Sequence, residues 1–124
     1  KALTAALGKL SEPNVVRFLE RHVVDEDATL EAQPPFPIPP GDLIALAKYF
    51  LATESPDATV PGSGTMLAEN FSFVGPVIGP LDKKEFMVNV KGIEFYDVFP
   101  DATAQLHHFR VDPFEPNRVW YTAR

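Results

Sequence analysis

The chain has 124 residues, of which 45% are hydrophobic and 23% are charged, and its formal net charge is −6. Because this charge would repel a polyanion, the composition argues against nucleic-acid binding. Cysteine is absent, which excludes disulfides and cysteine-bound metals, and no apolar run approaches the roughly 18 residues of a membrane span. The length predicts a single domain with N-terminal helices in 1–33, a proline-rich strap in 34–41, and a helix with a helix/sheet body in 42–124.

Two helices are predicted near the N-terminus. The first has leucines at helical spacing, and Ser11-Glu12-Pro13 is a start signal for the second, because proline is tolerated in a first helical turn. The acidic run at 25–27 is expected to end the second helix, and it lacks the pattern of a calcium loop. His22 has no ligand-like partner, so we interpret it as a core-boundary residue. The apolar stripe of the second helix consists of Val15, Phe18, Leu19, His22 and Val23.

The segment 33–41 contains five prolines and is predicted to run extended, because proline fixes φ and lacks a backbone donor. Two interpretations are open. Either the strap crosses the domain and buries its apolar side chains in a crevice, or its PxxP spacings dock in an aromatic groove of a partner. The candidate interface residues of the strap are Pro34, Phe36, Pro37 and Ile38.

An apolar helix is predicted over residues 43–53, with Asp42 as its N-cap. Because this helix has almost no polar face, we expect it to be buried on more than one side, against a pocket, a partner or the strap. Residues 55–65 contain many turn formers and are predicted to be a loop.

The stretch from residue 67 to residue 101 predicts a two-layer α+β unit. Phe71 and Phe73 alternate along a short strand with a packed face, and Gly-Pro pairs then turn the chain. Asp82 and Glu85 have the spacing of a capping box at the start of a helix. This helix is expected to bury Phe86, Met87 and Val90, to expose Lys83, Lys84 and Lys91, and to end at Gly92.

Two strands over 104–111 and 118–124 are predicted to form an antiparallel hairpin, because the connector between them is rich in turn formers. Alternation puts His107 and Tyr121 on the inner face and Trp120 on the other. The remaining residues expected on the inner face are Gln105, Phe109, Val111 and Val119.

The hairpin carries two kinds of candidate site. A buried His107 oriented by a carboxylate, with Asp97 as one candidate, and Tyr121 as a polarising hydroxyl would suit general acid/base catalysis. The other interpretation of His107 is a hydrogen-bonded structural residue. Trp120 beside Arg118 has a composition that is favoured at protein interfaces. No cofactor or metal site is predicted.

The order of these elements resembles the SnoaL-like branch of the nuclear transport factor 2-like superfamily. The resemblance rests on Phe71-x-Phe73-x-Gly75-Pro76, Phe99-Pro100-Asp101 and Asn117-Arg118-Val119-Trp120. It implies an α+β cone in which helices pack on a curved antiparallel sheet around a pocket. Members include polyketide cyclases, isomerase-like and dehydratase-like enzymes, and non-catalytic docking modules. SnoaL-like proteins of algal and plant plastids look similar to this chain, which implies a plastid location.

Two departures from the family pattern bear on function. The last strand stops at Arg124, where the pattern continues, so we expect a cone truncated at its C-terminal side with an open sheet edge. Asn70 stands where many relatives have Asp, and no residue is marked as catalytic. We therefore expect a soluble, non-catalytic subunit without a cofactor that docks into a larger protein complex or forms a homodimer. The alternatives are a small-molecule cyclase, isomerase or dehydratase with a pocket His-Asp pair, and a carrier of a small apolar ligand.

Overall fold

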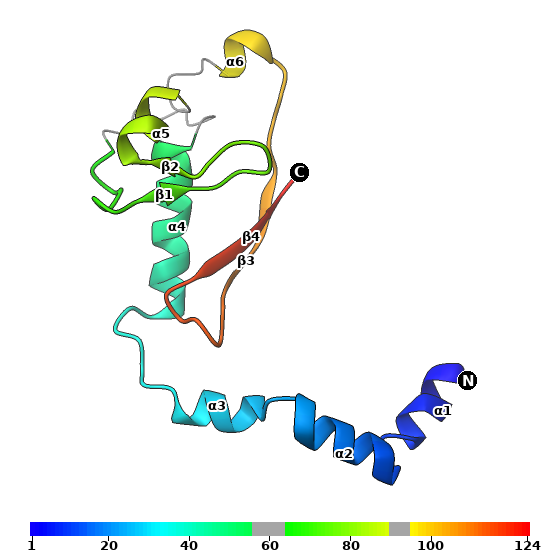
Figure 1. The fold of residues 1–124 in the computed structure, drawn as a ribbon. Helices are drawn as coiled ribbons and strands as arrows, with labels where there is room; N and C mark the ends of the chain where they lie inside the picture. The colour runs from blue at the N-terminus through cyan, green and yellow to red at the C-terminus, as the bar shows by residue number, and fades with distance from the viewer. Residues whose placement is uncertain (56–63, 90–94) are drawn as a thin grey trace. The chain divides into compact units, whose positions relative to one another are not determined.

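The computed structural model describes residues 1–55, 64–89 and 95–124, which divide into two compact units, Lys1–Pro35 and Phe36–Arg124 (Figure 1). The described residues form six helices and two antiparallel sheets of two strands each, so the predicted α+β class is confirmed. Among them, no helix has the length and apolar character that crossing a membrane requires. Most of the predicted loop, together with Val90, Lys91 and Gly92, lies outside the described residues.

The first unit consists of three short helices. The predicted end of the second helix before the acidic run is confirmed, because α2 ends at His22, but the sequence analysis missed a third helix, which Asp25 caps. The Asp25 side chain accepts a hydrogen bond from Ala28 N at 3.1 Å, and two acidic residues in the first turn complement the positive end of the helix dipole. No residue of these helices is buried. They are α1 (Ala2–Gly8), α2 (Pro13–His22) and α3 (Glu26–Ala32).

The second unit begins at Phe36, within the strap, and continues into α4 (Pro40–Glu54). This helix begins at Pro40 rather than at residue 43, so Asp42 lies in its first turn and Pro39 holds the N-cap position. The prediction of Asp42 as the cap is therefore wrong. The physical reason is that the first helical turn leaves its backbone N–H groups unpaired, so a proline there loses no hydrogen bond.

A helix and two short strands form the predicted two-layer unit. β1 (Ser72–Phe73) pairs antiparallel with β2 (Leu81–Asp82), which was not predicted as a strand, and α5 (Lys83–Asn89) contacts both. The capping box is confirmed in both directions. Asp82 N donates to Glu85 Oε2 at 3.0 Å, and Glu85 N donates to Asp82 Oδ1 at 2.8 Å.

Phe86 on α5 lies at the centre of the described core. Its side chain is 1% exposed, and its ring centroid lies 5.1 Å from those of Phe73 on β1 and of Phe71 just before β1, so both aromatic side chains contact the helix. Phe50 of α4 packs against the same cluster, which connects α4 to the β1, β2 and α5 layers. Other side chains of this cluster are Leu67, Leu81 and Met87.

The hairpin is the second sheet. β3 (Leu106–Val111) pairs antiparallel with β4 (Val119–Ala123), and both strands contact α4 (Figure 1). The register shifts between His107 and Arg110, where His108 has a φ of 59°. The alternation follows the prediction on β3, because His107, Phe109 and Val111 are half-buried and their neighbours are exposed. On β4 the prediction that Tyr121 faces inward is wrong, because Tyr121 is exposed and Thr122 is half-buried beyond the register shift. The short helix α6 (Phe95–Val98) precedes the hairpin.

Candidate functional site

The connector between β3 and β4 is folded around the carboxylate of Asp112. Asp112 Oδ1 accepts hydrogen bonds from Phe114 N at 2.8 Å and from Glu115 N at 3.1 Å. The backbone is closed by Asp112 N donating to Arg118 O at 2.9 Å and by Arg118 N donating to Glu115 O at 2.8 Å. An aspartate before a proline favours this kind of turn, because its side chain replaces a backbone acceptor. The connector thus has a defined shape imposed by one side chain.

The second carboxylate oxygen of Asp112 orients Trp120. The indole Nε1 donates to Asp112 Oδ2 at 2.8 Å, from β4 to the residue that follows β3. The guanidinium of Arg118 lies over the indole, with Cζ 5.3 Å from the ring centre, and pairs with Glu115 Oε2 at 2.8 Å. Trp120 nevertheless stays 44% exposed. We call this group of four residues, Asp112, Glu115, Arg118 and Trp120, the Trp120 cluster.

These contacts also favour the ionised form of the Asp112 carboxylate. The indole hydrogen bond from Trp120 and the backbone hydrogen bond from Phe114 hold the pKa of Asp112 below its ordinary value, and Arg118 acts in the same direction. A carboxylate whose pKa is lowered is ionised at neutral pH and remains an acceptor. The indole therefore has a charged partner at physiological pH.

The cluster is suited to contact with another protein. An exposed indole offers a large apolar surface, and the bond to Asp112 restricts its orientation before any partner arrives. Sequence reasoning identified Trp120 and Arg118 but missed Asp112 and Glu115. A signal for Asp112 was available, because a residue at the start of a hairpin connector lies beside the residues at the connector's other end.

The three candidate catalytic residues lie on different elements. His107 is half-buried on β3, Tyr121 is exposed on β4 and Asp97 is exposed on α6. The ring of His107 contacts that of His108, with 4.3 Å between centroids, and Tyr121 stacks on Phe109 at 5.5 Å. Within the described residues, these contacts do not include a carboxylate bonded to the imidazole of His107. No group of three or more acidic or histidine side chains in this part of the chain is arranged to hold a metal ion.

Comparison with known proteins does not assign a role to these residues. No family model, curated protein or solved structure matches this chain. The contacts, exposure and charges of the described residues are therefore the basis for a functional interpretation.

Among the described residues, each strand of the hairpin pairs along only one of its edges. The described sheet contains β3 and β4 alone, so each strand pairs on one side within the described ranges. The pairing extends to Arg124, where Gln105 N donates to Arg124 O at 2.8 Å and Arg124 N donates to Gln105 O at 3.1 Å. Unpaired N–H and C=O groups along such an edge are able to pair with an added strand.

The strap contributes a shallow apolar hollow beside α4. Of the predicted interface residues, Phe36 and Ile38 are half-buried, while Pro34 and Pro37 are exposed. Pro34 belongs to the first unit, so the hollow forms without it. The residues that line the hollow are Pro37, Ile38, Pro39, Asp42, Ala45 and Leu46.

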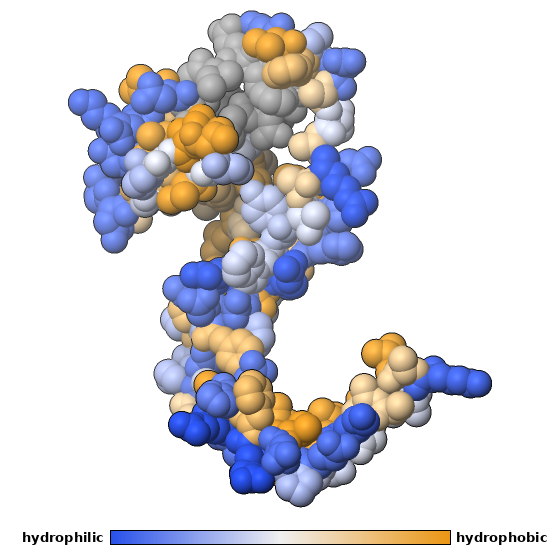
Figure 2. Space-filling model, turned by 45° about the vertical axis from the view of Figure 1, so that its right-hand side comes forward, coloured by the Kyte–Doolittle hydropathy of each residue, from blue (hydrophilic) through white to orange (hydrophobic). Residues whose placement is uncertain are grey.

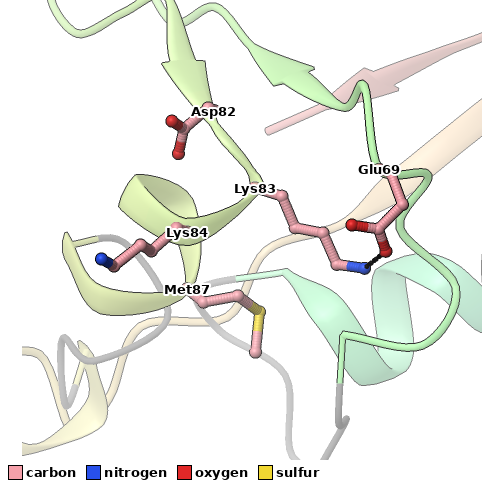
Figure 3. A pocket seen from close by; sticks show the side chains of 5 residues that line it. All are labelled: Glu69, Asp82, Lys83, Lys84 and Met87. Carbon is pink, nitrogen blue, oxygen red and sulfur yellow. Dashed lines mark hydrogen bonds and ion pairs between the residues drawn. The ribbon is translucent and has the colours of Figure 1, made fainter.

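A second, more polar hollow lies beside the start of α5 (Figure 3). Lys83 was predicted to be exposed, but its side chain is 28% exposed and its Nζ lies 2.8 Å from Glu69 Oε1. This contact lowers the pKa of Glu69, chiefly through the hydrogen bond from Lys83. Asp82, Lys84 and Met87 complete the lining. Because its lysines and acids are balanced, the hollow has no strong preference for a charged ligand.

Proposed function

We propose that this chain is a non-catalytic assembly subunit of the SnoaL-like, nuclear transport factor 2-like kind, and that its β3–β4 hairpin docks on a protein partner. In this proposal α4 and the hairpin form one wall of the family's cone. The observation that carries the proposal is the exposed indole of Trp120, which Asp112 and Arg118 hold in one orientation.

The energetics of protein interfaces support this role for Trp120. Tryptophan and arginine are enriched among the few residues that dominate binding energy, and they act best when they enter an apolar pocket. A side chain that is already oriented loses little conformational entropy on binding. The Nε1–H of Trp120 is satisfied within the chain by Asp112, so a partner has to supply only an apolar pocket for the ring.

The edge of β4 that is unpaired among the described residues supplies a second component of the proposed interface. A partner strand that pairs with β4 would add backbone hydrogen bonds next to the indole, and the side chains would then determine specificity. The hollow beside the strap is a further contact of the same kind. Its prolines are rigid, so they too lose little entropy on binding.

The enzyme alternative requires a carboxylate that orients His107 in a pocket. The described contacts of His107 support a packing role, because its imidazole lies against the ring of His108. The assembly proposal makes His107 dispensable for docking, which gives the two functions different experimental outcomes.

Photo-crosslinking in cells tests the proposal. The tagged chain is produced in its natural host with a benzophenone amino acid in place of Tyr121 on β4, or in place of Val77 as a control. Both positions are exposed, and Val77 lies in the turn between β1 and β2. We expect crosslinks to a distinct protein from position 121 and not from position 77.

Variants of the cluster then test its role in docking. We expect Trp120→Ala to lower crosslinking and co-elution with the partner at least about tenfold, the size of an interface hot spot. His107→Ala should leave both unchanged. The proposal is wrong if the wild-type chain elutes alone from host extracts, or if Trp120→Ala has no effect while His107→Ala abolishes a measured activity.

A further inference from the structure

The first unit exposes an unusual amount of apolar surface (Figure 2). Phe18, in the middle of α2, is 59% exposed, and Leu3 on α1 is 81% exposed. Figure 2 shows hydrophobic surface along this unit next to hydrophilic surface. The other large apolar side chains exposed here are Leu7, Leu10, Leu19, Val23 and Val24. Clustered exposed apolar residues of this kind mark interaction surfaces.

These helices are too short to be stable without a packing partner. α2 has 10 residues and α1 has 7, whereas isolated helices shorter than about 12–15 residues are marginal in water. Within this unit, no helix packs alongside another. The stability of α2 therefore requires that its apolar stripe be covered.

The charge distribution along the unit indicates what covers it. The N-terminal end carries Lys1 and Lys9 and no acidic residue before Glu12. The C-terminal end carries Asp25, Glu26, Asp27 and Glu31 and no basic residue. A surface with a basic end, an apolar centre and an acidic end is complementary to itself when a second copy lies antiparallel to it.

We propose that residues 1–35 form an antiparallel, two-fold symmetric interface with a second copy of this chain. The α2 stripes meet near Phe18 at the symmetry axis, and the basic end of each copy faces the acidic end of the other. The size is appropriate, because a standard interface uses about 20–30 residues on each side. This surface and the Trp120 cluster consist of different residues, so variants of each test dimer formation and partner docking separately.

Single-cysteine crosslinking tests the geometry directly, because the natural chain has no cysteine. Two copies of a residue near a two-fold axis meet each other, whereas copies of a residue near the ends do not. We therefore expect Phe18→Cys or Leu19→Cys to give disulfide-linked dimers under mild oxidation. We expect Leu3→Cys and the opposite-face control Arg17→Cys to stay monomeric.

Sedimentation measurements over a range of concentrations test the affinity. We expect Phe18→Glu to raise the dimer dissociation constant at least about tenfold, and Arg17→Gln, which changes the charge equally on the opposite face, to change it less than about threefold. Lys9→Glu and Glu31→Lys should each weaken the dimer about threefold or more, and the double variant should restore it. Trp120→Ala should have no effect on it.

Two outcomes overturn the proposal. One is a wild-type chain that remains monomeric at about 100 μM. A dissociation constant above that concentration would be weaker than a dimer interface of standard size provides. The other is efficient crosslinking at position 3 as well as at position 18, which would indicate a parallel pair. Circular dichroism of each variant confirms that the second unit remains folded, which keeps these results interpretable.

Discussion

Helices α2 and α5 have the same sequence pattern and opposite surroundings. Each has an apolar stripe with a phenylalanine at its centre. Phe86 on α5 is 1% exposed between Phe71 and Phe73, whereas Phe18 on α2 is 59% exposed and its described ring contact is with His22 at 4.7 Å on the same helix. Periodicity therefore defines the apolar face of a helix but not the surface that covers it.

The difference lies in the chain segments on either side of each helix. α5 is preceded by a strand pair and by Gly79, which let the chain return over the helix, so Phe71 and Phe73 reach Phe86 locally. α2 is followed by a short acidic segment and α3, and within the first unit neither α1 nor α3 packs over its apolar stripe. Complete burial of a phenylalanine stabilises a fold by about 1.5–3 kcal/mol, which α5 gains within the second unit and which α2 would gain in the proposed dimer.

The largest expected effect comes from truncating each phenylalanine. We expect Phe86→Ala to lower the free energy of unfolding by about 3–5 kcal/mol, because it leaves a cavity between Phe71 and Phe73. Phe18→Ala should change it by less than about 0.5 kcal/mol in dilute, monomeric protein. Urea denaturation followed by circular dichroism measures both.

Equal losses of unfolding free energy in Phe86→Ala and Phe18→Ala would contradict the difference between α5 and α2. They would mean that Phe18 is buried in the folded monomer. A small loss for Phe86→Ala would mean that the core lies elsewhere in the second unit.

The next largest expected loss of stability comes from replacing Gly79 in the second unit, with Gly8 in the first unit as the control. Gly79 has a φ of +119°, and a Cβ there would lie 2.6 Å from Phe73 O, so Gly79→Ala introduces both strain and a backbone clash. We expect a loss of about 1–3 kcal/mol in urea denaturation. A Cβ at Gly8, at the end of α1, would meet no atom within 4 Å, so Gly8→Ala is the matched control and should leave unfolding unchanged or raise helicity slightly. A neutral Gly79→Ala would show that the turn between β1 and β2 is not as tight as these distances indicate.

Local signals predicted the elements of the fold better than their contacts. The capping box at Asp82 and Glu85 was predicted correctly, because both hydrogen bonds join residues three apart. The third N-terminal helix was missed although Asp25 caps it, because a run of acids after α2 was interpreted only as a stop. The start of α4 was placed too late, because Asp42 was favoured as a cap over a proline in the first turn.

For the candidate site as well, the sequence predicted individual residues better than the contacts between them. Trp120 and Arg118 were identified from composition alone, while Asp112 and Glu115, which orient them, were interpreted only as residues of the turn. The role of Asp112 depends on the closing of the hairpin, which brings it to residues six and eight positions further along the chain. Patterns along the chain do not encode such distances until the turn is known.

The smallest expected effect distinguishes Trp120, an exposed aromatic that is held in place, from Phe18, an exposed aromatic that is not. Because the pKa of Asp112 is lowered in the folded chain, its contribution to stability is present above the usual aspartate pKa of about 3.9 and is lost as the pH falls through the lower, folded value. Protonation removes the charge from the acceptor of the indole N–H. Trp120 is the chain's single tryptophan, so tryptophan emission reports the surroundings of this one side chain.

We expect the emission of Trp120 to change in one step below about pH 3.9 while circular dichroism still shows the folded hairpin. Asp112→Asn should abolish the step, since it has no titrating carboxylate, and should resemble the acid form at neutral pH. Phe114 N and Glu115 N bond to Oδ1, and an asparagine carbonyl keeps that acceptor, so the turn survives in this variant. A step that persists in Asp112→Asn would assign it to another group and would place Trp120 with Phe18, as an exposed ring without a fixed orientation.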